Sequence, residues 1–219
     1  MQFNNTQYKL DEIYTLVTRE NELELEKTFV EQHTSFSRID FKELRDVVVK
    51  NHSGYANESH DGSSGSLNST LYNISRNNEE GSIDPEIGKV IDYDILVDGN
   101  KSFDLMTETR DKLYVINKQQ KDSEESLCKA VLEVITYHNL ISRKKLLLDY
   151  KNAKQNPINA AHTKHDLVPA VMLYEDSAPF NKLRSLDPNR FLGKLIQKYN
   201  VRFFVLKNTE ANELVLSEK

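Results

Sequence analysis

The stretch Lys89-Val-Ile-Asp-Tyr-Asp-Ile-Leu-Val97 opens a run of three predicted β-strands and one helix that ends near residue 142. The other two predicted strands cover residues 102–108 and 112–117. The dipeptide Asp98-Gly99 joins the first pair of strands, and Asp-Gly between β-rich segments is a strong hairpin signal. Residues 109–111 join the second pair. The stretch therefore predicts an antiparallel three-stranded meander followed by a helix.

The predicted helix after the meander has a recognisable start. Asp122 is followed three residues later by Glu125, which is the spacing of a capping box. Leu127, Val131 and Val134 then recur at helical spacing and predict one apolar face. We expect a helix that opens at Asp122 and packs this face on the meander.

Three segments are predicted along the chain. Residues 1–51 form an N-terminal helical segment, with an opening helix at 22–32 that packs on the core. Residues 52–87 are rich in Ser, Asn, Gly and Asp, and they predict a flexible polar insertion. Residues 88–219 form an α/β core.

The end of the core has a strand–helix–strand pattern, with strands at 167–174 and 201–206 and a helix at 180–199. We expect Asn200 to end this helix in the left-handed conformation. A strand–helix–strand unit predicts parallel strands, whereas the hairpins predict antiparallel ones. The fold class is therefore α/β, with a mixed central sheet, flanking helices and additional N-terminal helices.

Composition limits the classes of partner and compartment. The formal net charge of the 219 residues is −5, which argues against a broad nonspecific grip on nucleic acid and leaves a local basic patch open. The single cysteine, Cys128, excludes a disulfide within the chain and favours a cytoplasmic location. Neither a secretory signal nor an apolar run of membrane-spanning length occurs, so we expect no membrane partner.

The order of these elements resembles the PD-(D/E)XK, or restriction-endonuclease-like, superfamily, whose core is αβββαβ. That family carries an Asp on the second meander strand, and Asp104 in Ser-Phe-Asp-Leu-Met matches it. The family's acid-x-Lys triplet on the third strand falls on Asn117 and Gln119. Its opening helix often supplies a further acid, for which Glu26 is the best equivalent and Glu22 the alternative. The resemblance implies that Asp104 and Glu26 hold Mg²⁺.

The resemblance also implies the chemistry expected at these positions. Hydrolysis of a phosphodiester needs charge neutralised on the phosphoryl oxygens and a nucleophile generated at neutral pH, and divalent metals supply both. Asn117 is a neutral, weaker metal ligand than a carboxylate, and Gln119 lacks the positive charge of the family's lysine. Tyr137, near the end of the crossover helix, and the basic residues Lys144 and Lys145 are the predicted substrate-binding side chains.

Three hypotheses about function follow. The first is a PD-(D/E)XK-like domain with an eroded metal site, an inactive or altered nuclease relative that binds nucleic acid or a protein partner. The second is an active Mg²⁺-dependent nuclease, in which Glu108 or Glu133 joins Asp104 and Glu26 at the metal. The third is a protein-interaction module without a nucleic-acid role. The oligomeric state stays open, with a homodimer as one alternative.

Overall fold

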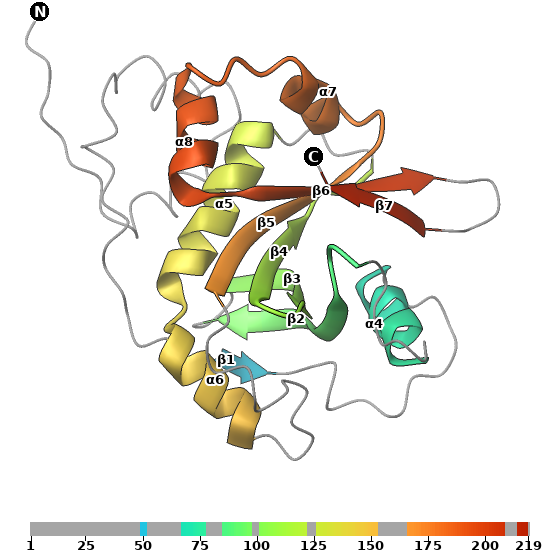
Figure 1. Ribbon diagram of the computed structural model, residues 1–219, viewed down its shortest axis with the longest axis vertical. Helices are drawn as coiled ribbons and strands as arrows, with labels where there is room; N and C mark the ends of the chain where they lie inside the picture. The colour runs from blue at the N-terminus through green and yellow to red at the C-terminus, as the bar shows by residue number, and fades with distance from the viewer. Residues whose placement is uncertain are drawn as a thin grey trace, which may run out of the picture.

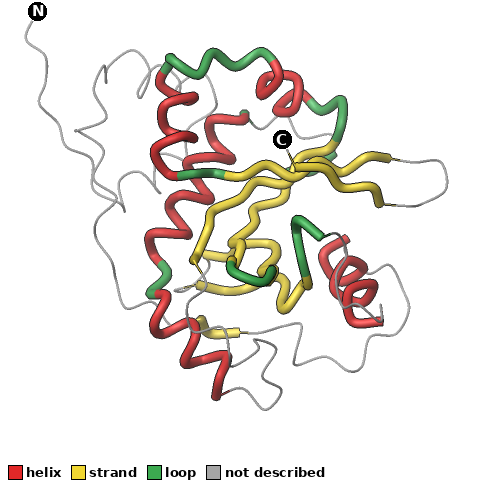
Figure 2. Tube along the Cα trace, in the orientation of Figure 1, coloured by secondary structure: helices red, strands yellow, loops and turns green. Residues whose placement is uncertain are grey.

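A computed structural model of the chain describes residues 49–51, 67–77, 85–97, 101–121, 126–152, 166–208 and 214–218. In these ranges the chain forms one seven-stranded sheet and five helices, shown as ribbons in Figure 1 and by secondary structure in Figure 2. The strands are β1 (Val49–Asn51), β2 (Lys89–Val97), β3 (Lys101–Glu108), β4 (Lys112–Lys118), β5 (Asp166–Tyr174), β6 (Arg202–Asn208) and β7 (Leu214–Glu218). The helices are α4 (Leu67–Asn77), α5 (Leu127–Leu140), α6 (Arg143–Asn152), α7 (Ala178–Arg184) and α8 (Phe191–Tyr199).

The sheet is mixed, as the sequence predicts. Strands β1 to β4 pair antiparallel, and β7 pairs antiparallel with β6. Strands β4, β5 and β6 pair in parallel, with α5 and α6 between the first two and α7 and α8 between the last two. The order of the strands across the sheet is the same as their order in the chain.

Helices cover both faces of the sheet, because strand side chains alternate between the two sides. On one face, Val115, Val171 and Phe203 pack in a core with residues of α5, α6, α7 and α8. On the other face, Tyr114 and Met172 pack in a second core with residues of α4. Figure 1 shows α4 on the opposite side of the strands from α5, α6 and α8. We call these the α5 face and the α4 face.

The helix α4 corrects the predicted flexible insertion. Leu71 of this helix is fully buried against the sheet, and Ser75 Oγ accepts a hydrogen bond of 3.0 Å from the backbone N–H of Val90. Residues 67–77 of the predicted flexible insertion therefore form a helix that packs on the sheet. Residues 49–51 form a strand where the sequence predicts a helical segment, and the predicted helices that precede them lie outside the described residues.

The start of α5 differs from the predicted capping box. The helix begins at Leu127, and the side chain of Ser126 accepts a hydrogen bond of 3.0 Å from the backbone N–H of Lys129. Ser126 is thus the N-cap residue, a role that serine fills well. The predicted start at Asp122 is wrong by about one turn, and residues 122–125 lie outside the described part of the chain.

The predicted helix at 180–199 is two helices. Ser177 caps α7 by accepting a hydrogen bond of 3.3 Å from the N–H of Phe180, and α8 begins only at Phe191. The loop between them packs so tightly on α8 that a Cβ at Gly193 would lie 2.5 Å from Cα of Pro188. The predicted end is confirmed, because Asn200 caps α8 in the left-handed conformation, with φ 51° and ψ 43°.

Candidate functional site

The strands β3 and β4 separate at one end of their ladder. Their pairing runs from Glu108–Leu113 to Leu105–Ile116 and stops there. Beyond this point β3 continues beside β2, while β4 continues beside β5 as far as Lys118 and Met172. The result is a notch in the sheet between the start of β3 and the end of β4. The predicted site residues Asp104, Asn117 and Gln119 all belong to these two strand ends.

The carboxylate of Asp104 bridges the notch. Its Oδ2 accepts a hydrogen bond of 2.7 Å from the backbone N–H of Lys118, in place of a partner in the ladder. Its Oδ1 accepts a hydrogen bond of 3.2 Å from Nδ2 of Asn68 on α4. Asp104 therefore connects both strands of the notch to the helix on the α4 face.

A second carboxylate lies beside Asp104. The amide nitrogen of Asn68 also donates a hydrogen bond of 2.7 Å to Oδ1 of Asp94, so one donor serves two acids. The pairs Tyr93–Leu105 and Ile95–Phe103 place Asp94 directly across from Asp104. Asp94 has a positive φ of 49°, an uncommon conformation for a residue inside a strand. We call Asp94 and Asp104 the carboxylate pair.

The environment of Asp104 disfavours its charged form. Burial raises the pKa of the Asp104 carboxyl above its usual value, and the negative charge of Asp94 raises it further. The hydrogen bonds from Lys118 and Asn68 and the positive charge of Lys118 act in the opposite direction. Because the net direction is upward, the effect of burial on Asp104 outweighs its hydrogen-bond donors and the positive charge of Lys118.

Asn117 belongs to a separate group on the α5 face. Its Nδ2 donates a hydrogen bond of 2.7 Å to Oε2 of Glu133, and the hydroxyl of Tyr137 donates one of 3.2 Å to Oε1 of the same residue. Glu133 and Tyr137 are one turn apart on α5, so both side chains lie on the same stripe of the helix. We call Asn117, Glu133 and Tyr137 the α5 triad.

Gln119 follows Asn117 on the same face but is enclosed. Its side chain is only 2% exposed, and its backbone N–H donates to the carbonyl of Met172 at 2.9 Å. Its Oε1 is buried without a hydrogen-bond partner within the described structure. A neutral amide at this depth avoids the cost of burying the ammonium group that the family resemblance would place there.

Of the remaining predicted residues, those that the structure describes do not join these groups. Lys144 and Lys145 are on α6, and in the described ranges no hydrogen bond or ion pair connects either of them to Asp104. Glu108 lies four residues along β3 from Asp104, about 13 Å away at the usual rise of a strand, so it cannot share a metal with Asp104. Glu26 lies outside the described residues.

Among the described residues, the side chains at the positions matched by the family resemblance therefore point to different faces of the sheet. Asp104 reaches toward the α4 face, whereas Asn117 is held by Glu133 on the α5 face. In the part of the chain that the structure describes, no group of three or more His, Cys, Asp and Glu side chains is arranged to hold a metal ion. Among the described side chains the notch brings two carboxylates together, and magnesium prefers several oxygen ligands.

Comparisons with protein-family models, with curated proteins and with solved structures find no match. The described helices include none that is long and apolar enough to cross a membrane.

Two of the residues at the notch were not predicted as site residues from the sequence. Asp94 could have been found, because the hairpin at Asp98-Gly99 puts the second acid of Asp-Tyr-Asp close to Asp104 once the register is counted. Asn68 had no comparable signal, because it lies in a polar segment where Asn and Ser are frequent. Glu133 was named from the sequence only as an alternative metal ligand, and the structure instead gives it two hydrogen-bond donors from the protein.

Proposed function

We propose that this chain is a PD-(D/E)XK-like domain that binds a partner without hydrolysing phosphodiester bonds. The arrangement of elements supports this proposal: β2, β3 and β4 form a meander, α5 crosses over, and β5 returns parallel to β4. The strands separate where the family's charged residues would lie. The family's opening helix corresponds to residues 22–32, which lie outside the described residues.

The observation that carries the proposal is the hydrogen bonding of the side chains at the family's positions. Both oxygens of Asp104 accept from protein donors, and the amide of Asn117 donates to Glu133. Gln119 is buried and carries no charge. Protein donors thus take the place that cations have in a hydrolytic site, and no described side chain at positions 117 or 119 can neutralise a phosphoryl oxygen or activate water.

An active Mg²⁺-dependent nuclease is the second candidate, and the carboxylate pair favours it. Asp94 and Asp104 both reach the same amide nitrogen, so a cation that displaced the amide would meet two carboxylate oxygens. Such a centre would lie on the α4 face and would not use Asn117.

The deciding experiment is a cleavage assay on single- and double-stranded DNA and RNA with Mg²⁺ or Mn²⁺. The chain, Asp104→Ala and Asp166→Ala are compared, the last being a control that removes an exposed acid at the start of β5. We expect no metal-dependent cleavage by any of the three proteins. Cleavage that disappears in Asp104→Ala and persists in Asp166→Ala would replace the proposal by the nuclease alternative.

A further inference from the structure

Basic side chains outnumber acidic ones on α7, α8 and the loop that joins them. Residues 178–200 contain five basic side chains and a single acidic one, Asp187, whereas the formal net charge of the whole chain is −5. The five are Lys182, Arg184, Arg190, Lys194 and Lys198, and all of them are exposed. We call this set the basic face.

Three basic residues, which we call the stripe, follow one side of α8 from its N-cap onward. Arg190 is the N-cap residue, and Lys194 and Lys198 follow at intervals of four residues. Residues four apart lie on the same side of a helix, with a rise of about 6 Å per interval. The opposite side of α8 carries Leu192 and Leu195, which are buried in the core of the α5 face. The stripe therefore points away from the domain.

Aromatic rings lie under two of the basic side chains. The guanidinium carbon of Arg184 lies 6.0 Å from the centre of the Phe180 ring, and Nζ of Lys198 lies 5.2 Å from the centre of the Tyr199 ring. Cations placed over ring faces keep their charge toward water while the rings support the side chains. The rings already restrict the two side chains. Less conformational entropy is therefore lost when these side chains bind a ligand.

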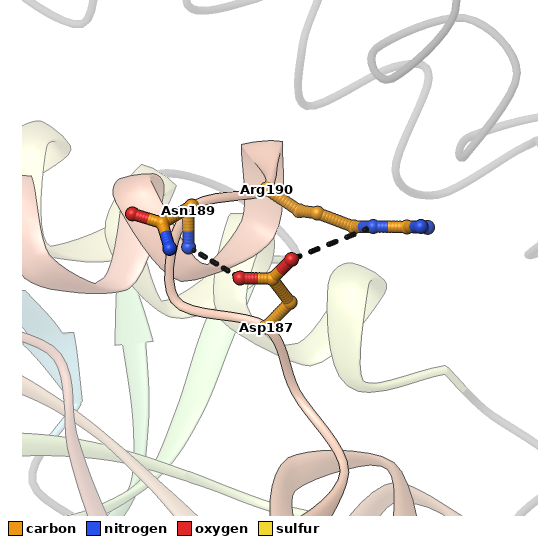
Figure 3. Close-up of polar contacts among 3 residues, drawn as sticks. All are labelled: Asp187, Asn189 and Arg190. Carbon is orange, nitrogen blue, oxygen red and sulfur yellow. Dashed lines mark hydrogen bonds and ion pairs between the residues drawn. The ribbon is translucent and has the colours of Figure 1, made fainter.

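Asp187 does little to neutralise the basic face. Figure 3 shows that its carboxylate serves two residues: Oδ1 accepts a hydrogen bond of 2.9 Å from the backbone N–H of Asn189, and Oδ2 lies 3.9 Å from Nε of Arg190. The side chains of Arg190 and Asp187 are 80% and 50% exposed, and an ion pair that long and that exposed is weak. Asp187 shapes the turn before α8, and an external anion can compete with it for Arg190.

We propose that the basic face binds the phosphate backbone of nucleic acid, independently of base sequence. This inference rests on the proposed function, because it names the partner of a domain that binds without hydrolysing. Binding to a phosphate backbone depends on exposed Lys and Arg side chains, and the basic face has five of them. Protein interfaces and membrane-surface helices depend on apolar anchors. Among the described side chains, the exposed large hydrophobic residues are Ile74 and Leu148, and neither is on α7 or α8.

The test measures binding of the full chain to a fluorescent double-stranded DNA and a single-stranded RNA in metal-free buffer, over a range of salt concentrations. The triple variant Arg190→Ala, Lys194→Ala, Lys198→Ala removes the stripe. Its matched control, Lys89→Ala, Arg110→Ala, Lys121→Ala, removes one Arg and two Lys that are also exposed but lie elsewhere. Asp187→Asn removes the competing acid.

We expect the affinity of the stripe variant for nucleic acid to be at least tenfold lower at moderate salt. The slope of log affinity against log salt concentration should become shallower by about 3, which is about 1 for each cation removed. The control triple variant should keep most of the affinity, and Asp187→Asn should bind more tightly than the unaltered chain. An equal loss in the two triple variants would overturn the inference, because net charge alone would then explain binding.

Two further probes test the class of partner. Polyglutamate and vesicles of anionic lipid carry negative charge without a nucleic-acid backbone. Binding to either one as tightly as to nucleic acid would overturn the inference, as would the absence of nucleic-acid binding by the unaltered chain. Metal-dependent cleavage would instead overturn the proposed function and leave the basic face as the binding surface of an enzyme. The two failures are therefore distinguishable.

Discussion

The α5 triad and the carboxylate pair lie on opposite faces of the same notch and differ in how their charge is balanced. In the triad, a single acid, Glu133, receives hydrogen bonds from both Asn117 and Tyr137. In the pair, two acids share one side-chain donor, Asn68. The triad is thus a satisfied polar network, which stabilises and rigidifies its surroundings. The pair is a site with excess negative charge.

This difference shows that the two faces use their polar side chains differently. The amide of Asn117 is a hydrogen-bond donor to the neighbouring helix, so on the α5 face the polar side chains hold the strand and the helix together. On the α4 face Asp94 and Asp104 lie beside each other, and burial raises the pKa of Asp104. Among the described residues, affinity for cations is therefore expected at the carboxylate pair.

The largest predicted effect comes from breaking the triad. Glu133→Ala leaves the amide of Asn117 and the hydroxyl of Tyr137 without their acceptor, and both residues are buried. We expect a loss of roughly 2–3 kcal/mol in the free energy of unfolding, measured with urea. Glu133→Gln is the matched variant, because it keeps an acceptor for Asn117 and should lose clearly less. Equal stability of Glu133→Ala and the unaltered chain would show that the triad has no structural role.

The next effect comes from removing the shared donor of the pair. Asn68→Ala leaves Asp94 and Asp104 facing each other, and we expect a loss of roughly 1–2 kcal/mol at pH 8. Addition of Mg²⁺ or Ca²⁺ should restore part of it, because a cation can occupy the position of the amide. Asn73→Ala, at an exposed position of α4, is the control and should show neither change. A loss in Asn68→Ala that no cation reduces would count against cation affinity at the pair.

The contributions of the two faces to the free energy of unfolding should change in opposite directions as the pH falls. On the α5 face, burial lowers the pKa of His138 below its usual 6.5, and Nε2 of this residue lies 3.0 Å from the carbonyl oxygen of Leu167. The unfolded chain then binds a proton more readily than the folded one. Stability should fall as the pH drops below about 6.5, by at most about 1.4 kcal/mol per pH unit from this group. The measurement is urea unfolding from pH 8 to pH 5.5. His138→Gln should flatten the dependence, and an unchanged slope would assign it to other groups.

The smallest predicted effect is a gain in stability at the pair. The raised pKa of Asp104 means that its charged form is less favourable in the folded chain than in the unfolded one. Its contribution to stability is therefore present at low pH and lost as the pH rises through the folded-state pKa. Asp104→Asn removes the buried charge, and we expect it to raise the free energy of unfolding at pH 8 by roughly 0.5–1 kcal/mol. The gain should vanish at pH 3. Destabilisation at pH 8 would show that the Lys118 contact outweighs the charge.

Much of the fold could be predicted from the sequence, because its signals are local. The β-rich runs, the Asp-Gly turn and the position of Asn200 specify elements within a few residues, and the mixed sheet follows from their order. The errors concern segments where local composition and tertiary packing disagree. Residues 67–77 are polar overall, yet Leu67, Leu71 and Tyr72 are enough to anchor a helix once a sheet face is present.

The candidate site was predicted less completely than the fold. Asp104, Asn117 and Gln119 were placed correctly at the two strand ends, because period 2 along a strand and the resemblance both specify positions. The division of the site between two faces could not be predicted. It depends on which helix supplies the partner of each side chain. Asn68 is 36 residues from its partner Asp104, and Glu133 is 16 residues from its partner Asn117.

The identical order of strands in the chain and in the sheet has a consequence for how the protein forms during synthesis. A chain that leaves the ribosome from its N-terminus can add each new strand to the outer edge of those already paired, so no strand has to insert between two others. Each addition also covers the exposed edge that the previous one left, which limits the time for which an unpaired edge can recruit another chain. The longest wait falls between β4 and β5, when α5 and α6 are made and can already pack on the meander.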